Sequence, residues 1–77
     1  MTDTISLRLF ATLSKRMPED ADRYPITQGT TVRDIVERLK IKEDEARLIF
    51  VNNRKALLTS VLDDGDRLGI FPPVGGG

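Results

Sequence analysis

Apolar and polar residues alternate from the fifth residue onward, where the first regular element is expected. Ile5, Leu7 and Leu9 occupy alternate positions, and Phe10 follows on the opposite, otherwise polar side. A period of two is typical of a strand with one buried face. We therefore predict a strand over residues 5–10 whose Phe10 ring lies on the polar face, where a large apolar side chain is unusual.

A helical period replaces this alternation at residues 31–40. Apolar residues recur there at spacings of three and four, and charged residues fill the positions between them: Val32, Ile35, Val36 and Leu39 form the stripe. Thr31 precedes the stripe, and Asp34 follows Thr31 by three positions, which is close to a capping box. The pattern predicts one long amphipathic helix whose apolar stripe must be covered by a sheet.

Two further runs, residues 47–51 and 67–71, predict strands in the second half of the chain. The first ends at Asn52-Asn53, and the second is preceded by Gly65; both sites favour a tight turn. In the final strand Leu68 and Ile70 are expected to point inward and Phe71 outward.

The pattern does not decide which side of the 47–51 strand faces the helix, because residues 48–51 are all apolar. We place Leu48 and Phe50 toward the helix. Ile49 and Val51 then point outward, beside Arg47.

Shorter elements complete the prediction. A turn or two of helix is expected over residues 11–17, with Leu13 and Met17 on one side. A short strand over residues 24–27 should lie at a sheet edge, because Pro25 cannot donate a ladder hydrogen bond. Residues 56–58 are expected to form a short return strand.

These elements predict an α+β fold in two layers, a mixed sheet of four to five strands with one main helix packed on one face. The first and last strands are expected to lie side by side and parallel in the centre. The open face would then gather a set of apolar residues and arginines that we predict to bind a partner: Arg8, Phe10, Arg47, Ile49, Val51, Arg67 and Phe71. The alternative is that the loop from residue 17 to 24 covers part of this face.

Composition restricts the chemistry. The 77 residues include 12 basic and 12 acidic side chains, no cysteine and no histidine. Zero net charge argues against nucleic-acid or membrane partners, and the missing residue types exclude disulfides, imidazole ligands and Cys-His or Ser-His catalysis. The aspartates around Gly65 lack the spacing of a calcium loop, so no metal site is expected. We expect a soluble, cytoplasmic protein that is monomeric when free.

The last six residues differ from the rest, and we predict a 1–71 domain followed by a 72–77 tail. Pro72 and Pro73 fix φ and hold the chain extended, and Val74 leads to Gly75, Gly76 and Gly77, which carry no side chains. Six extended residues reach about 20 Å. A stiff stem with a slender tip suits insertion into a narrow slot of another protein. On composition alone, an idle chain end is the competing interpretation.

Several segments resemble the small subunit of molybdopterin synthase and, more broadly, the ThiS–MoaD family of ubiquitin-like, β-grasp sulfur carriers. The resemblance covers nearly the whole chain. Its motifs are Leu7–Ala11, Gly29–Asp34, Phe50–Asn52, Asp64–Asp66 and the Phe-Pro-Pro stem with terminal glycines, Phe71–Gly77. Residues 14–26 match the family pattern poorly.

The resemblance implies a carrier and subunit that is not an enzyme by itself and that binds no cofactor. An E1-like partner would use ATP to adenylate the Gly77 carboxylate, and a persulfide donor would convert it to a thiocarboxylate. The sulfur would then pass to a precursor held by the large synthase subunit or another acceptor enzyme, with molybdopterin as the expected product. The alternatives are a thiamine-pathway carrier, a ubiquitin-like modifier that forms isopeptide bonds through Gly77, and a binding module with inert glycines.

Overall fold

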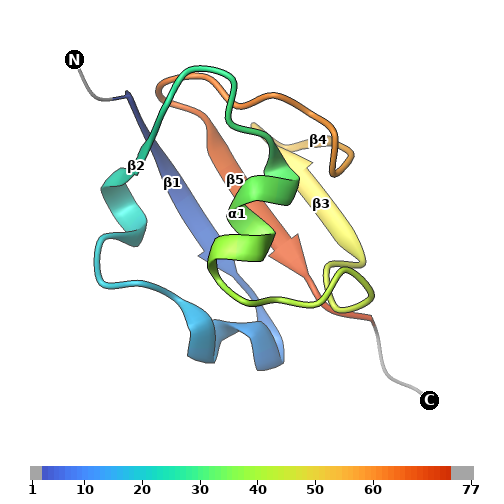
Figure 1. Cartoon of the computed structure of the whole chain (residues 1–77). Helices are drawn as coiled ribbons and strands as arrows, with labels where there is room; N and C mark the ends of the chain where they lie inside the picture. The colour runs from blue at the N-terminus through green and yellow to red at the C-terminus, as the bar shows by residue number, and fades with distance from the viewer. Residues whose placement is uncertain (1–2, 74–77) are drawn as a thin grey trace.

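The computed structural model describes residues 3–73, within which five strands form one mixed sheet. The strands are β1 (Asp3–Leu9), β2 (Tyr24–Ile26), β3 (Leu48–Val51), β4 (Arg54–Lys55) and β5 (Arg67–Phe71). Figure 1 shows their order, β2-β1-β5-β3-β4. The central strands β1 and β5 are parallel, and the other neighbouring pairs are antiparallel. The predicted pairing of the first and last strands is confirmed, as is the edge position of the strand that contains Pro25.

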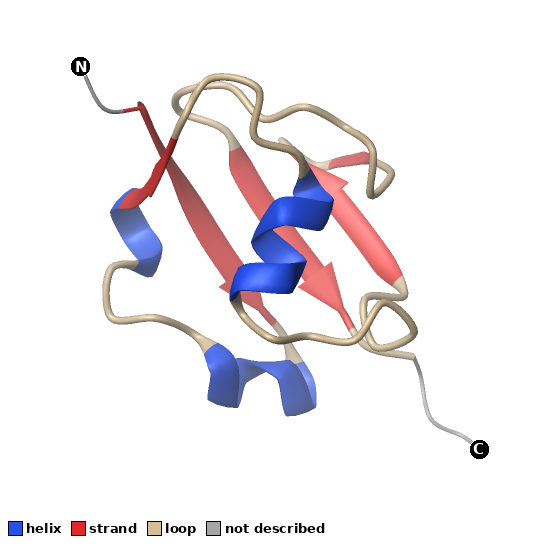
Figure 2. Cartoon of the chain, in the orientation of Figure 1, coloured by secondary structure: helices blue, strands red, loops and turns tan. Residues whose placement is uncertain are grey.

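The helix α1 (Val32–Arg38) crosses one face of this sheet, as Figure 2 shows. Its start is the predicted capping box: the Asp34 amide donates to Thr31 Oγ1 at 3.3 Å, and the Thr31 amide donates to Asp34 Oδ2 at 2.9 Å. One helix on a mixed sheet is the arrangement of the ubiquitin-like β-grasp fold, so the predicted fold class is confirmed. No helix within residues 3–73 is long and apolar enough to cross a membrane.

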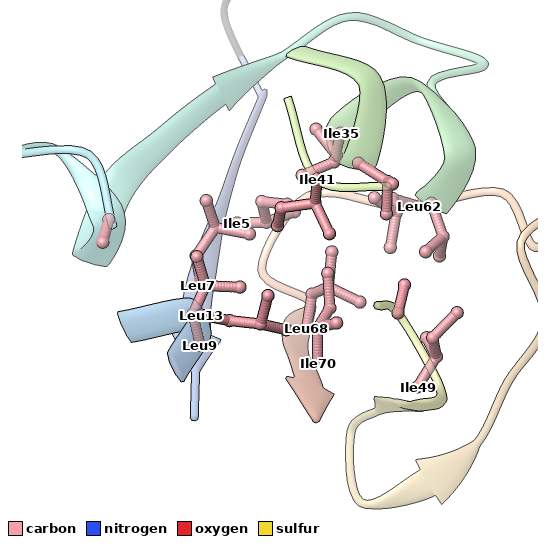
Figure 3. Close-up of a cluster of buried hydrophobic side chains, with 14 of the residues drawn as sticks. Ile5, Leu7, Leu9, Leu13, Ile35, Ile41, Ile49, Leu62, Leu68 and Ile70 are labelled. Carbon is pink, nitrogen blue, oxygen red and sulfur yellow. The ribbon is translucent and has the colours of Figure 1, made fainter. Parts of the chain in front are cut away.

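The core lies between α1 and the sheet (Figure 3). Alternate residues of β1 and β5 supply its floor, and the helix stripe supplies its roof. Leu13 of the 3₁₀ helix η1 (Ala11–Arg16) and Ala21 of η2 (Ala21–Arg23) extend it beside β1. The buried apolar residues are Ile5, Leu7, Leu9, Leu13, Ala21, Ile26, Val32, Ile35, Val36, Ile41, Ala46, Ile49, Leu62, Leu68 and Ile70.

Two local predictions are wrong. The predicted helical segment after β1 is present, but it is a 3₁₀ helix with about three residues per turn, so the expected shared side of Leu13 and Met17 is wrong, and Met17 is exposed. The return strand is Arg54–Lys55, before the predicted 56–58. Asn52 and Asn53 both adopt positive φ, 54° and 67°. This pair makes a two-residue hairpin turn, and the ladder therefore resumes immediately at Arg54.

Candidate functional site: the open face of the sheet

The face of the sheet opposite α1 carries an aromatic cluster formed by Phe10, Phe50 and Phe71. The Phe10 and Phe71 rings are parallel, with centroids 4.1 Å apart and 2° between their planes. Phe50 meets Phe71 edge-on, with centroids 5.7 Å apart and an angle of 86°. The β1–β5 ladder extends one residue beyond β1, because the Phe10 amide donates to the Ile70 carbonyl at 3.2 Å. This bond brings Phe10 beside Phe71.

The aromatic cluster lines a groove of about 490 Å³. Gly69 forms part of its floor: a Cβ there would lie 3.5 Å from Phe10 Cε2, so the missing side chain leaves the space beside the ring open. The lining residues are Arg8, Phe10, Phe50, Asn53, Arg67, Leu68, Gly69 and Phe71. None of them belongs to the 17–24 segment. That segment therefore does not line the groove, although its Asp22 reaches Arg8 at the border.

Two arginines line the groove and a lysine shares its face of the sheet. Arg8 and Arg67 line it directly. Lys55 pairs with Phe50 in the β3–β4 ladder, and residues directly opposite each other in a ladder share a face. Arg8 Nη1 lies 3.5 Å from Asp22 Oδ1, and both side chains are largely exposed. The groove thus has an apolar floor and a positively charged border.

Arg67 is placed by hydrogen bonds between the β3–β4 turn and the start of β5. Asn52 Nδ2 donates to Asp66 Oδ1 at 2.9 Å, and the Arg67 amide donates to Asn52 Oδ1 at 3.0 Å. The Asn52 amide in turn donates to the Arg67 carbonyl at 2.9 Å. These bonds hold the arginine's backbone beside the β3–β4 turn, at the border of the groove.

The prediction that Ile49 and Val51 point to the open face is wrong. Ile49 is 5% exposed, and Val51 packs against the core. The cause is the antiparallel register, in which Ile49 lies opposite the fully buried Ile70. Opposite residues share a face, so the alternate residues Leu48 and Phe50 take the outward positions.

The other predicted partner-binding residues divide into two groups. Arg8, Phe10, Arg67 and Phe71 come together in the groove, whereas Arg47 is exposed just before β3 and does not line it. The Arg47 amide donates to the Phe71 carbonyl at 3.0 Å, at the end of the sheet.

The open-face residues that sequence reasoning missed include Leu48, Phe50, Asn53, Lys55 and Gly69. A signal for Phe50 was present. The chain has three phenylalanines, and two of them had already been assigned to this face. The prediction that the face binds a partner remains a prediction.

The groove follows β5 from Arg67 to Phe71, the residue at which the chain leaves the sheet. Phe71 ends β5 and is followed by the half-buried Pro72 and the exposed Pro73. The predicted reactive Gly77 and its neighbours Val74, Gly75 and Gly76 lie outside the described residues. Within residues 3–73, no cluster of acidic side chains could hold a metal ion.

Comparison with known proteins connects this arrangement to a family. The sequence profile of the ThiS family matches residues 7–77, nearly the whole chain. The chain belongs to the ThiS family. It therefore belongs to a family of small, ubiquitin-like β-grasp proteins that includes sulfur carriers, and the resemblance seen in its motifs is confirmed. As a ThiS-family member it is similar in sequence to small archaeal modifier protein 3 of Haloferax volcanii, with 29% identity over 90 aligned residues that cover 95% of this chain and 98% of the relative.

Solved structures support the same assignment for this ThiS-family chain. The solution structure of the Haloferax volcanii HVO 2177 protein has a TM-score of 0.76 and 27% identity, covering 99% of this chain and 88% of the other. A Pyrococcus furiosus protein provisionally named molybdopterin converting factor, subunit 1, has a TM-score of 0.63 and 27% identity, covering 94% and 99%. The crystal structure of SAMP1 from Haloferax volcanii, at 21% identity and a TM-score of 0.67, supports the fold alone.

Proposed function

We propose that this protein carries sulfur on the α-carboxylate of Gly77. The observation that supports the proposal most directly is the ThiS-family match, which extends through residue 77. The fold is consistent with it, because the central strand β5 ends at Phe71, directly before the tail and beside the partly exposed aromatic cluster. A 1–71 domain would hold and present a 72–77 tail whose terminal carboxylate reacts in the partner's active site.

The proposed chemistry begins with activation, because a carboxylate is a poor electrophile. In an E1-like partner, a carboxylate oxygen of Gly77 attacks the α-phosphorus of ATP and pyrophosphate leaves. The terminal sulfur of a persulfide donor then attacks the acyl carbon of the adenylate, and AMP leaves. A thiol cleaves the resulting acyl disulfide by attacking the donor's sulfur, which releases the thiocarboxylate and forms a disulfide with the donor.

The residue types of the tail suit these steps. Glycine at positions 75–77 leaves the acyl carbon unhindered and lets the backbone approach the nucleotide closely. Pro72 and Pro73 stiffen the stem, and Val74 connects the stem to the tip. The chain has no cysteine, so the persulfide comes from a partner.

For the sulfur acceptor we propose a molybdopterin precursor bound to a large synthase subunit. The Phe-Pro-Pro stem supports this choice, as does the name of the Pyrococcus furiosus relative. A thiamine precursor is the alternative within sulfur transfer.

A second function is supported by the relative named small archaeal modifier protein 3. In this role the activated Gly77 carbonyl would form an isopeptide bond with a lysine of another protein.

The deciding experiment is intact mass spectrometry after incubation with the E1-like enzyme of the same organism, ATP and a persulfide donor. We expect an oxygen-to-sulfur exchange that fragmentation localises to Gly77. The chain lacking Gly77 is the control and should show no exchange. Adducts with larger proteins that resist hydroxylamine would favour the modifier function. An unchanged mass with an enzyme that adenylates the chain would refute sulfur transfer.

A further inference from the structure

The groove differs from the rest of the molecule in the sign of its charge. The whole chain has equal numbers of acidic and basic residues. The described strand positions on the open face nevertheless include Arg8, Lys55 and Arg67 and no Asp or Glu. An apolar floor with a cationic border is complementary to an apolar side chain flanked by carboxylates.

One carboxylate already approaches this border from within the molecule. Asp22 of η2 lies 3.5 Å from Arg8, and both side chains remain largely exposed. Such a pair contributes little to stability and exchanges readily with other partners. Asp22 therefore occupies a place that a carboxylate of a bound protein could take.

We propose that the groove receives an acidic segment of the partner protein, whose apolar side chain packs on the aromatic cluster and whose carboxylates bind Arg67 and Arg8. In the free protein Asp22 occupies the position of one of these carboxylates and competes with the partner. The proposal rests on the carrier function, since a carrier must dock before its tail can react. It adds the partner's chemistry and an internal competitor.

A protein segment fits better than single-stranded nucleic acid, which also prefers aromatic rings beside cations. The rings of Phe10 and Phe71 are stacked on each other with centroids 4.1 Å apart, which leaves no gap for a base between them. Among the described strand positions of this face, the cations are limited to Arg8, Lys55 and Arg67 and form no extended basic stripe. Their number is small beside the extended phosphate contacts that nucleic-acid binding requires.

The proposal predicts that replacing either arginine and replacing Asp22 change the affinity for the partner in opposite directions. Replacing Arg67 or Arg8 by Gln removes a cation that the partner binds, so the affinity should fall about 2- to 5-fold, as for exposed ion pairs. Replacing Asp22 by Asn removes the competitor, so the affinity should rise by about the same factor. In the double variant R8Q/D22N, removal of Asp22 should have no further effect, because its target is already absent.

Titration calorimetry of the full chain with the E1-like enzyme, without ATP, tests these signs at low and at high salt. R38Q on α1 is the matched control for the arginines, and E37Q on the same helix is the control for D22N; neither should change Kd. The differences among groove variants should shrink at high salt, because screening weakens exposed ion pairs.

Three results would overturn the proposal: an unchanged or weakened affinity in D22N, arginine variants that behave like R38Q, or tight binding of a single-stranded RNA oligonucleotide that R67Q abolishes. The sulfur exchange at Gly77 is measured separately. If the wild type exchanges oxygen for sulfur but the charge variants bind as the wild type does, only the docking proposal is rejected. If binding depends on these charges but no exchange occurs, sulfur transfer is rejected and the docking proposal remains supported.

Discussion

Phe10 and Phe71, which stand at opposite ends of the sequence, stack with their ring centroids 4.1 Å apart and their planes nearly parallel. The contact joins the end of β1 to the end of β5, directly before Pro72. Phe10 remains 39% exposed in spite of this stacking. Part of the Phe10 ring therefore stays available to a partner beside the residue that precedes the tail.

The Phe10→Asp variant tests whether this surface docks a partner. Loss of an anchoring ring should weaken binding to the E1-like enzyme by about 10-fold or more. Because the ring lies outside the core, loss of its stacking should lower the Tm by only about 4–8 °C. Calorimetry and thermal melting measure the two effects. Leu57→Asp is the control, since Leu57 is 68% exposed and does not line the groove. Unfolding of Phe10→Asp would show instead that Phe10 belongs to the core.

The register of β3 can be tested by two truncations. Ile49→Ala removes a buried side chain and should cost about 2–5 kcal/mol in the free energy of unfolding. Leu48→Ala, at a half-buried position of the other face, should cost distinctly less. Urea denaturation compares the two variants with the wild type. The opposite order would support the register in which Leu48 faces the helix.

The side-chain hydrogen bonds of Asn52 should contribute more to the stability of the fold than its tolerance of a positive φ. Asn52→Gly keeps the positive φ but removes the bonds to Asp66 and Arg67, so it should destabilise the fold by about 1 kcal/mol. Asn53→Gly is the matched control, because Asn53 also has a positive φ. It should be neutral or slightly stabilising. Equal losses in the two variants would mean that glycine's chain entropy is responsible.

The capping box predicts a measurable loss of stability when Thr31 is replaced by a residue without a hydroxyl group. Thr31→Ala removes the acceptor for the Asp34 amide, and such changes typically cost about 1 kcal/mol. Thr31→Ser keeps an acceptor hydroxyl and should recover most of this loss. Chemical denaturation measures both. If alanine and serine were equally destabilising, the methyl group and not the cap would be the stabilising part of Thr31.

Asp34 should make stability depend on acid pH. Its carboxylate accepts the Thr31 amide hydrogen, and this bond is the largest cause of a lowered pKa. The folded state therefore releases this proton more readily than the unfolded state. The ionised carboxylate stabilises the fold above the pKa of the unfolded state, and this stabilisation is lost as the pH falls through the pKa of the folded state.

Denaturation between about pH 5 and pH 3 should show this loss, and Asp34→Asn should show a shallower pH dependence. In a Thr31→Ala background the effect of Asp34→Asn on the slope should shrink, because the two residues act as one cap. A slope unchanged by Asp34→Asn would assign the pH dependence to other carboxylates.

Local patterns in the sequence determined most of the fold. The alternation around Leu7, the helix stripe and the Thr31–Asp34 cap each involve neighbours in the chain, so propensity and periodicity are sufficient to predict them. The central pairing of the first and last strands was predicted because it covers the helix stripe with apolar residues of both strands. Membership of the carrier family was also readable, because its stem and glycine motifs are contiguous.

The tertiary structure decided the features that depend on contacts between residues far apart in the sequence. In β3 all four residues are apolar, so the sequence could not say which pair faces the helix; the pairing of Ile49 with the buried Ile70 did. That register moved Phe50 to the open face and completed the aromatic cluster. The approach of Asp22 to Arg8 likewise arises from the path of a loop. Periodicity carries no information about such contacts, because it reports only which residues of one element share a side.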